Sequence, residues 1–381
     1  MSEKKQNTLI IGGGVIGLAT GWQLARSGLS VTIFEAAQAG ASTSRAGAGM
    51  LAPNAEAIFE EEELLKHNRH SLSLLYPFLE ELQEDTNLPV PSINHRGSLL
   101  VALDQDDRRA LERLYRFRKE IGLEVEWLTG TEIREMEPLL SPRTIAGLKL
   151  GEDCEIDNVK LIYALKDAFV RVGGELKEHS PVEEVLMENG KPRGIYVNGS
   201  FHEGNNLLVA AGSYSSQIKG VPEGILPPLR PVKGQIVELE STEECDLSRM
   251  VRSPRIYLVP KDTGRLLVGA TSEEKGFDTT VTAGGVWYVL DEGWRTVPGI
   301  YELPKTMDMA GLRPTTPDHR PVMGPAEGYN SLFLATGFFR HGFLLMPLAA
   351  YGISGQIMDR EQPVIPDCFL PERFSKNRQA T

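Results

Sequence analysis

The sequence predicts a mixed α/β (α+β) protein, in which a doubly wound parallel sheet is combined with an antiparallel sheet. Three observations predict this fold class. A strand, a glycine-rich turn, a helix and a second strand follow one another within the first 35 residues. Two apolar runs that end in glycine, residues 207–212 and 332–337, have the composition of buried parallel strands. Residues 231–300 instead alternate short strands with turns, which is typical of an antiparallel sheet.

The first 35 residues form a β-turn-α-β unit. Residues 8–11 are a short apolar run that predicts a strand and leads into three glycines. Apolar residues then recur at helical spacing until Gly28, which ends the helix. Residues 31–34 predict the second strand, and Glu35 closes it.

The later elements follow from the same patterns. Residues 60–115 are largely helical and begin with the acidic run 60–63, which we interpret as a solvated face or loop without a partner. The remaining predictions are a strand at 97–103, helices at 105–120 and 161–172, and strands at 256–260 and 265–270 around a turn at Gly264.

The two domains are discontinuous in the sequence, because no Pro/Ser-rich linker separates them. We expect the chain to leave the first domain and return to it. The predicted nucleotide-binding domain comprises residues 1–90, 150–225 and 310–365. The predicted substrate domain comprises residues 91–149 and 226–309, and residues 366–381 form a tail.

Composition excludes several classes of protein. The chain has 381 residues, of which 41% are hydrophobic and 24% charged, so disorder is excluded. Forty Lys and Arg against 52 Asp and Glu give a net charge of −12, which argues against a nucleic-acid partner. The three cysteines, Cys154, Cys245 and Cys368, are far apart, so we expect neither disulfides nor a cysteine metal site, and a cytoplasmic location. His67 and His70 have no third ligand in sequence, and we predict no metal.

Targeting and membrane segments are also not expected. Two lysines precede the first apolar run, but the glycines within it have a better explanation and no cleavage site follows. The apolar stretch 342–357 contains Pro347 and two later glycines, and it is too short and too broken to span a bilayer.

The strongest motif is Gly12-x-Gly14-x-x-Gly17, placed between the first strand and the first helix. The first glycine permits a tight turn, the second lets the backbone approach a pyrophosphate, and the third lets helix and sheet pack closely. Free N–H groups at the start of that helix attract phosphate. Glu35 lies at the end of the second strand, where its carboxylate can bind ribose hydroxyls. Together these features predict a Rossmann-like dinucleotide site.

A second ligand-binding loop favours FAD over NAD. Apart from Arg45 and Met50, residues 40–50 are small or hydroxylated, so their backbone can approach a large flat ligand and their hydroxyls can bind a pyrophosphate. FAD is buried in extended form across its domain and needs such a second loop. The alternative interpretation is an ordinary surface loop.

At this point the sequence resembles the D-amino-acid oxidase superfamily of flavoenzymes, and within it the glycine oxidases of thiamine-thiazole biosynthesis. The resemblance is carried by GGGVIG (12–17), Glu35, STSRAGAGM (42–50), AGLRP (310–314) and ATGFFRHG (335–342). It extends over residues 8–360. AGLRP and ATGFFRHG are the segments that distinguish this family, because many other flavoproteins share the N-terminal motif GGGVIG.

The resemblance implies a Rossmann-like FAD-binding domain, with Val182 next to the adenine and residues 338–344 beside the flavin ring. Monomeric sarcosine oxidases attach their flavin through a cysteine at the position of residues 314–318, where this chain has none, so we predict non-covalent FAD. The expected FAD-binding residues are Gly12, Gly14, Val15, Ile16, Gly17, Glu35, Ala36, Thr43, Ser44, Ala48, Gly49, Met50, Val182, Phe338, Phe339, Arg340, His341, Gly342, Phe343 and Leu344.

The expected substrate-binding residues are Tyr257, Arg313 and Arg340, with Met50 beside them. An amino-acid carboxylate is bound best by the two-pronged guanidinium of an arginine, and Arg313 lies in an otherwise apolar segment. Tyr257 can share that carboxylate through its hydroxyl. The alternatives are a structural ion pair for Arg313, core packing for Tyr257 and backbone orientation for Arg340.

The resemblance further implies oxidative deamination of glycine, sarcosine and small D-amino acids. We expect hydride transfer from the substrate Cα to flavin N5, hydrolysis of the imine, and reoxidation by O2 to give hydrogen peroxide. No dedicated base is needed, and we assign His341 to packing or orientation. The positive end of the last helix, near Gly342, can face the flavin. A homotetramer is expected from the resemblance alone.

Three functional hypotheses remain open from the sequence. The first is the oxidase. The second is a D-amino-acid or sarcosine dehydrogenase that passes electrons to a quinone, and oxygen consumption separates these two. The third is a non-catalytic FAD-binding partner protein, which has no use for the combination of Tyr257, Arg313 and Arg340. Arg255, two residues before Tyr257, can alter the substrate range.

Overall fold

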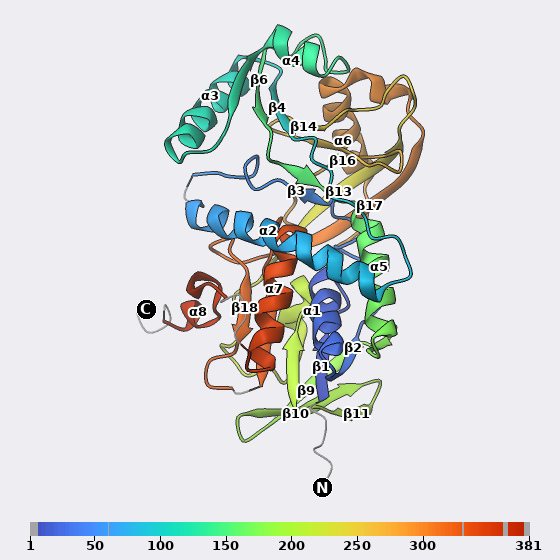
Figure 1. Ribbon diagram of the computed structural model, residues 1–381, viewed down its shortest axis with the longest axis vertical. Coiled ribbons are helices and arrows are strands. Elements are labelled where there is room, and N and C mark those ends of the chain that lie inside the picture. Colours follow the sequence, from blue (N-terminus) through green and yellow to red (C-terminus); the bar gives the residue numbers. More distant parts are fainter. Residues whose placement is uncertain (1–6, 60, 330, 361–364, 377–381) are drawn as a thin grey trace.

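The computed structural model describes residues 7–59, 61–329, 331–360 and 365–376. It consists of two bodies stacked along the long axis (Figure 1). The lower body contains a parallel sheet and the upper body an antiparallel sheet. Two long strands, β13 (Arg230–Glu240) and β17 (Lys305–Thr315), reach from the junction into the upper body.

The lower body is built on a six-stranded sheet, which confirms the predicted Rossmann-like architecture. Five strands are parallel and one edge strand, β18, is antiparallel to its neighbour. The strand order is β18 (Val322–Pro325), β19 (Leu332–Thr336), β12 (Asn206–Val209), β1 (Asn7–Ile11), β2 (Ser30–Phe34) and β8 (Glu175–Lys177).

Four helices form the apolar core next to this sheet. Helix α1 (Val15–Arg26) contacts α5 (Asn158–Arg171) and α7 (Gly342–Ile357), and α2 (Glu62–Asp85) lies across α5 and α7. Helix α7 is buried along almost its whole length, which explains why it is apolar on all sides. The described part of the predicted tail belongs to this body, because Phe369 in η3 (Asp367–Phe369) is fully buried in the same core.

The upper body is an eight-stranded, mainly antiparallel sheet. From β17 and β13 it continues with β16 (Arg265–Gly269), β15 (Tyr257–Pro260), β14 (Met250–Arg252), β4 (Ser98–Ala102), β6 (Ala146–Leu150) and β5 (Glu126–Thr129). Its helices are α3 (Gln105–Glu120), α4 (Gly130–Met136) and α6 (Ala283–Thr296). The sequence pattern did not predict α6, because glycines at both ends weaken the helical signal.

The smaller elements pack around the two large sheets. The meander β9 (Val182–Glu188), β10 (Lys191–Val197) and β11 (Ser200–Glu203) lies below the parallel sheet in Figure 1. The remaining elements are the pair β3 (Met50–Leu51) and β7 (Cys154–Glu155), the 3₁₀ helices η1 (Gly212–Gln217) and η2 (Pro298–Glu302), and α8 (Glu372–Lys376).

The structure differs from two expectations from the sequence. The expected domain boundary at residue 310 falls inside β17, so this strand belongs to both predicted segments. The prediction that the acidic run 60–63 has no partner is wrong for Glu61, which pairs with Arg340, and for Glu63, which pairs with Arg320. Residue 60 lies outside the described residues. Charge patterning along the sequence cannot reveal these pairs, because both arginines come from the other end of the chain.

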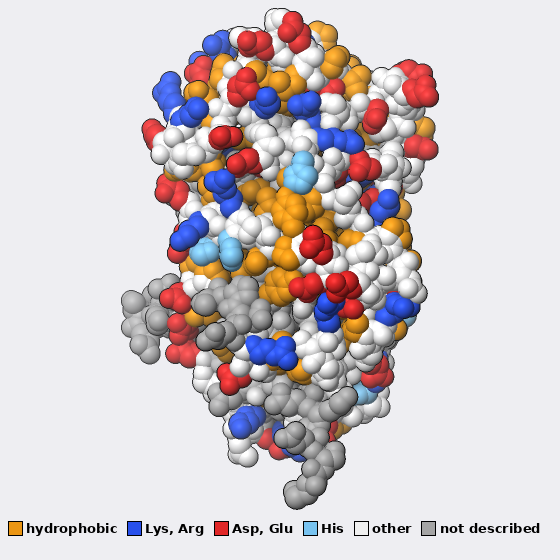
Figure 2. Space-filling view, in the orientation of Figure 1, with side chains coloured by type: hydrophobic (Ala, Val, Ile, Leu, Met, Phe, Trp, Pro, Cys, Tyr) orange, Lys and Arg blue, Asp and Glu red, His pale blue; other side chains and the backbone are white. Residues whose placement is uncertain are grey.

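The surface is mixed in charge. On the face shown in Figure 2, acidic and basic side chains are interspersed around an apolar central area, and the coloured residues form no continuous basic patch. Among the described helices, none is long and apolar enough to cross a membrane.

Candidate functional site

A large cavity, of about 870 Å³, lies where the two bodies meet. Its lower side is formed at the carboxyl ends of the parallel strands, where Gly12 follows β1, Glu35 follows β2 and Ala210 follows β12. Its upper side is formed by the strands from β13 to β17. Open α/β sheets bind ligands at the carboxyl ends of their strands, and the volume suits a cofactor together with a small substrate.

The glycine motif has the geometry that the sequence predicts. Gly12 has a φ of +108°, and a Cβ on it would lie 2.5 Å from the carbonyl oxygen of Ala210. A Cβ on Gly17 would lie 2.0 Å from the carbonyl oxygen of Gly12, so the start of α1 packs directly on the turn. Gly14 is different, because a Cβ there would meet only Ser44 at 3.4 Å, so this position borders the cavity.

The start of α1 and Glu35 form the nucleotide end of the cavity. Gly14 is the N-cap of α1 and provides no side-chain cap, while the N–H of Val15 donates to Ser44 Oγ at 3.0 Å. Glu35 accepts the N–H groups of Gly13 (2.7 Å) and Ala37 (2.9 Å), which hold its carboxylate at the tip of β2. The carboxylate still lines the cavity, where its remaining lone pairs can accept hydroxyl groups.

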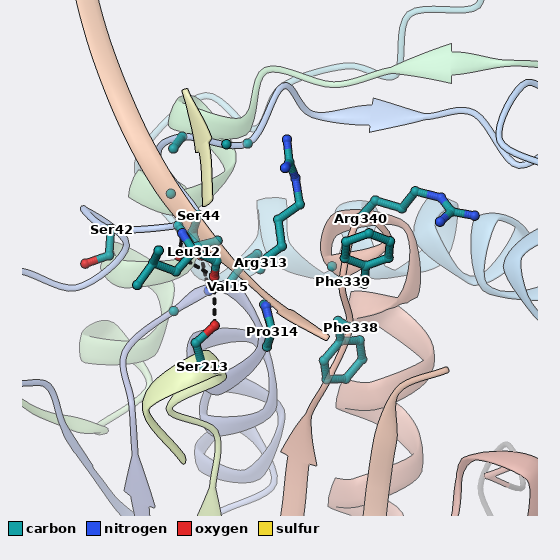
Figure 3. A pocket seen from close by; sticks show the side chains of 18 of the residues that line it. Val15, Ser42, Ser44, Ser213, Leu312, Arg313, Pro314, Phe338, Phe339 and Arg340 are labelled. Atoms are coloured by element: carbon teal, nitrogen blue, oxygen red, sulfur yellow. Dashed lines mark hydrogen bonds between the residues drawn. The ribbon is translucent and has the colours of Figure 1, made fainter. Parts of the chain in front are cut away.

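The loop 40–49 is attached to the opposite body by Thr43. Its hydroxyl donates to the Leu312 carbonyl and accepts the Leu312 N–H, both at 3.1 Å. Ser213 Oγ also donates to that carbonyl at 3.0 Å, as Figure 3 shows. We expected the hydroxyls of this loop to be available for a pyrophosphate. In the structure the Thr43 hydroxyl binds backbone as donor and as acceptor and so positions the loop, whereas Ser44 Oγ accepts the Val15 N–H and can still donate its own proton.

Most of the residues expected to bind FAD line this cavity. Three do not: Gly17, which lies under the turn, and His341 and Leu344, whose side chains are buried at the start of α7. The lining residues from the prediction are Gly12, Gly14, Val15, Ile16, Glu35, Ala36, Thr43, Ser44, Ala48, Gly49, Met50, Val182, Phe338, Phe339, Arg340, Gly342 and Phe343.

Tyr257 and Arg313 meet in the upper side of the cavity, and two glycines make room for them. A Cβ on Gly234 of β13 would lie 2.4 Å from Arg313 Nη2, and a Cβ on Gly269 of β16 would lie 2.6 Å from Tyr257 Oη. Burial raises the pKa of Tyr257, against the effect of the Arg313 guanidinium. The phenol therefore stays protonated at neutral pH and can donate a hydrogen bond.

Four arginines line the cavity, and they differ in their partners. Within the described part of the chain, Arg313 makes no ion pair with Asp or Glu, and its Nη1 donates to the Thr271 carbonyl at 3.2 Å. The other three pair with carboxylates: Arg252 with Glu56 (3.2 Å), Arg255 with Asp107 (3.5 Å), and Arg340 with Glu61. A cavity-lining guanidinium without a protein carboxylate is available for a ligand carboxylate.

Arg340 points away from Arg313, toward α2 (Figure 3). Its Nη2 binds Glu61, and its Nε lies 3.7 Å from Glu56 Oε2. This arrangement matches the alternative of an orienting residue more closely than that of a second substrate clamp. Met50 also lines the cavity, in β3, where it pairs with Glu155.

Glu56 is the most densely paired carboxylate of the site. Burial alone would raise its pKa, but Arg252, His341 and Arg340 lower it below its usual value, so the group is ionised. His341 Nδ1 lies 3.3 Å from Glu56 Oε2. Burial lowers the pKa of His341 to about 4, so its imidazole is neutral near pH 7. These contacts fit a packing or orienting role for His341, which stays a prediction.

Sequence reasoning did not identify several lining residues, namely Glu56, Arg252, Ser213, Tyr214 and Thr271. Glu56 lies in a loop with no motif, and Arg252 lies at the end of a three-residue strand. A signal did exist for Arg252, because it lies five residues before Tyr257 across a turn. In β14 and β15 the two residues are direct register partners.

None of the three cysteines and none of the histidines is among the residues that line the cavity, although His341 contacts the lining residue Glu56. Non-covalent attachment of FAD stays a prediction. The expectation that His67 has no third ligand is wrong, because its ring lies beside Glu63 and Cys368 with the ligating atoms within 4.8 Å of one another. Arg320 binds Glu63 at 2.7 Å, however, and burial raises the pKa of the Cys368 thiol to about 11.

Comparisons with known proteins agree with this geometry. A family profile described as "DAO: FAD dependent oxidoreductase" matches residues 7–354. A glycine oxidase of Geobacillus kaustophilus (strain HTA426) is 31% identical over 358 residues, which are 94% of each chain. A crystal structure of glycine oxidase from Geobacillus kaustophilus has a TM-score of 0.89 at 30% identity, covering 97% of this chain and 99% of that one. The bifunctional protein ThiO/ThiG of Trichormus variabilis (strain ATCC 29413 / PCC 7937) is 30% identical over 99% of this chain and 56% of its own length.

Proposed function

The chain belongs to the DAO family of FAD-dependent oxidoreductases, and from this premise we propose that it deaminates glycine and other small amines, such as sarcosine and small D-amino acids. It is an FAD-dependent amine or amino-acid oxidase. One observation carries the choice of substrate. Arg313, the cavity-lining guanidinium without a carboxylate partner among the described residues, lies beside the protonated phenol of Tyr257.

The two side chains suit the carboxylate of an amino acid. A guanidinium binds a carboxylate through two parallel N–H···O bonds, which fix its orientation as well as its charge. The Tyr257 hydroxyl can donate a further hydrogen bond to the same group. With the carboxylate held in this way, the Cα–H bond of a small substrate has one preferred direction, which is the requirement for a transfer reaction from carbon.

The cavity fits FAD along its lower side. The adenosine end would lie near Glu35 and Val182, and the phosphates would lie at the N–H groups that begin α1. The flavin end would lie near residues 338–343, where α7 begins and its dipole favours negative charge. When bound, the flavin supplies the acceptor for a hydride.

The chain's own residues then have limited tasks. Arg313 and Tyr257 bind and orient the substrate, and the pair Arg340–Glu61 fixes the turn before α7. We assign no general base, since removal of a hydride requires only that the amine is neutral. We propose that the imine product supplies thiamine-thiazole biosynthesis, which the similarity to ThiO/ThiG proteins supports. Cytoplasmic location and a homotetramer stay predictions.

An absorption spectrum of the purified holoenzyme tests the function. Glycine is added without oxygen, and air is then admitted while hydrogen peroxide is measured. Loss of the flavin bands with glycine, followed by their return with peroxide in air, is the expected result. Bleaching that air does not reverse would favour the dehydrogenase, and a protein that binds no FAD would overturn the proposal.

A further inference from the structure

We propose that Glu56 determines which arginine of the cavity binds the substrate carboxylate, and thereby excludes substrates that carry a second acid group. This inference deepens the proposed function and rests on it, because it concerns a substrate with a carboxylate. Glu56 is here a specificity-determining residue that acts through Arg252 and Arg340.

The cavity contains more guanidinium groups than a small amino acid can use. Arg313 on β17 and Arg252 on β14 belong to strands on opposite sides of β15, the strand that carries Tyr257, and both guanidinium groups line the cavity. Arg252 is the direct register partner of Tyr257 on β14. Without a counter-charge, Arg252 would bind a carboxylate by the same interactions as Arg313.

Glu56 provides that counter-charge from within the cavity lining. Its Oε1 accepts a hydrogen bond from Arg252 Nη1 at 3.2 Å, and its Oε2 lies 3.7 Å from Arg340 Nε. Its carbonyl oxygen lies 3.4 Å from Arg340 Nη2 as well. One carboxylate therefore occupies two of the four cavity arginines, while Arg313 stays available.

The loop around Glu56 is held in place by buried charges on both sides. The carboxylate of Asp153 accepts the N–H groups of Asn54 and Ala55, each at 3.1 Å. From the other side, the buried guanidinium of Arg118 donates to the carbonyls of Ala55 (2.8 Å) and Ala57 (3.3 Å). These contacts fix the backbone on either side of Glu56, so its carboxylate remains aimed at Arg252.

The consequence is selectivity between monoacids and diacids. In the native protein the guanidinium of Arg313 is available to bind a monocarboxylate. A dicarboxylate would have to displace Glu56 from Arg252, which leaves a buried carboxylate without its partner. Removal of the Glu56 charge should release Arg252 to bind a second carboxylate, so the affinity for dicarboxylates should rise. Glycine could then also bind through Arg252, in a reversed and unreactive orientation.

The test compares acetate with malonate and succinate as ligands of the FAD-loaded protein, by calorimetry and by the change in the flavin spectrum. In Glu56→Gln we expect the ratio of diacid to acetate affinity to rise about tenfold or more, and glycine to show substrate inhibition. Glu63→Gln is the matched control. It removes a carboxylate from Arg320, which does not line the cavity, and leaves the Glu56–Arg252 pair intact, so the ratio should stay native.

Two further variants keep the test decisive. Glu56→Asp retains the charge but withdraws it from Arg252, so it should shift the ratio in the same direction by less, even if Glu56→Gln does not fold. The double variant Glu56→Gln/Arg252→Met should restore the native ratio. Equal changes for acetate and the diacids in both Glu56 variants would overturn the inference. Failure of glycine to reduce the native flavin would instead overturn the proposed function, and the ligand comparison does not depend on that reaction.

Discussion

Arg313 and Tyr257 approach each other across two strands, because the residues beneath them, Gly234 and Gly269, have no side chains. Arg313 comes from β17 and Tyr257 from β15, and β13 and β16 lie between those strands in the sheet. A Cβ at either glycine would overlap one of the two functional side chains. The close approach of Arg313 and Tyr257 therefore depends on all four neighbouring strands, β17, β13, β16 and β15.

Arg313→Ala should raise the KM for glycine by about 10- to 100-fold, since charge-assisted hydrogen bonds contribute about 1.5–3 kcal/mol. FAD should stay bound, because the substitution lies in the upper side of the cavity. Steady-state kinetics and the flavin spectrum check both statements. Arg230→Ala, an exposed arginine at the start of the adjoining strand β13, is the control and should change neither. An unaltered KM in Arg313→Ala would show that another group binds the carboxylate.

Tyr257→Phe should raise the KM for glycine less than Arg313→Ala does. It removes one hydroxyl donor and leaves the ring above Gly269, so we expect a KM for glycine about fivefold higher, for a loss of about 1 kcal/mol. Tyr288→Phe, on the exposed face of α6, is the matched control. A fall in kcat with no change in KM would contradict a role in binding.

Thr43→Val should loosen the attachment between the two bodies. The substitution keeps the shape of the side chain but removes both hydrogen bonds to Leu312, at a cost of about 1–3 kcal/mol. We expect a lower unfolding midpoint in urea and weaker FAD binding. Thr43→Ser retains the hydroxyl and should behave almost as the native protein, and equal losses in both variants would refute this account.

Gly17→Ala should destabilise the protein by about 3 kcal/mol or more, because the added methyl group would meet the Gly12 carbonyl at 2.0 Å. Loss of FAD should accompany it, since the turn that binds the phosphates must move. Gly284→Ala provides the contrast. This glycine lies in the first turn of α6 with open space around it, so alanine should stabilise by about 0.5–1 kcal/mol. Urea unfolding followed by tryptophan and flavin fluorescence measures both.

His341 should make stability depend on pH. Its pKa is about 4 in the folded protein and has the ordinary value of 6.5 when exposed, so only the unfolded chain binds a proton between these values. The associated stability is present above pH 6.5 and is lost as the pH falls toward 4. Between pH 7.5 and 4.5 the loss is about 2.5 kcal/mol.

The comparison with His341→Gln isolates this contribution. Groups other than Glu56, which contacts His341, titrate alike in both proteins, so the difference between their unfolding free energies should shrink by about that amount as the pH falls. A difference that is independent of pH would mean that His341 has the same pKa in the folded and the unfolded protein.

The sequence predicted the lower body well because its signals are local. The strand, turn and helix around Gly12–Gly17 and the apolar strands before Ala210 and Gly337 each depend on a few consecutive residues. Helix α6 and the small sheets were not predicted, because glycines or short length hide them. The same limit applies to β17, where a predicted boundary fell inside a strand whose pairing with β13 sequence alone does not reveal.

The site residues that belong to recognisable motifs could be predicted from the sequence. The site residues that are positioned by ion pairs could not. Arg313 and Tyr257 came from the family resemblance together with the chemistry of a carboxylate. Glu56 and Arg252 are about 200 residues apart in sequence, and nothing in either segment indicates the other. The pairing of Arg340 with Glu61 was likewise invisible, and it changes what Arg340 is free to do.

The order of the strands also determines when the protein can acquire its cofactor during synthesis. The parallel sheet contains the first strand of the chain, β1, and one of the last, β19, and the cavity is lined both by the turn after β1 and by Phe338 and Phe343. Helix α7, which covers α1, ends at Ile357. The apolar residues of α1 therefore stay without their final partners until the chain up to Ile357 has left the ribosome, and FAD can be enclosed only after that point.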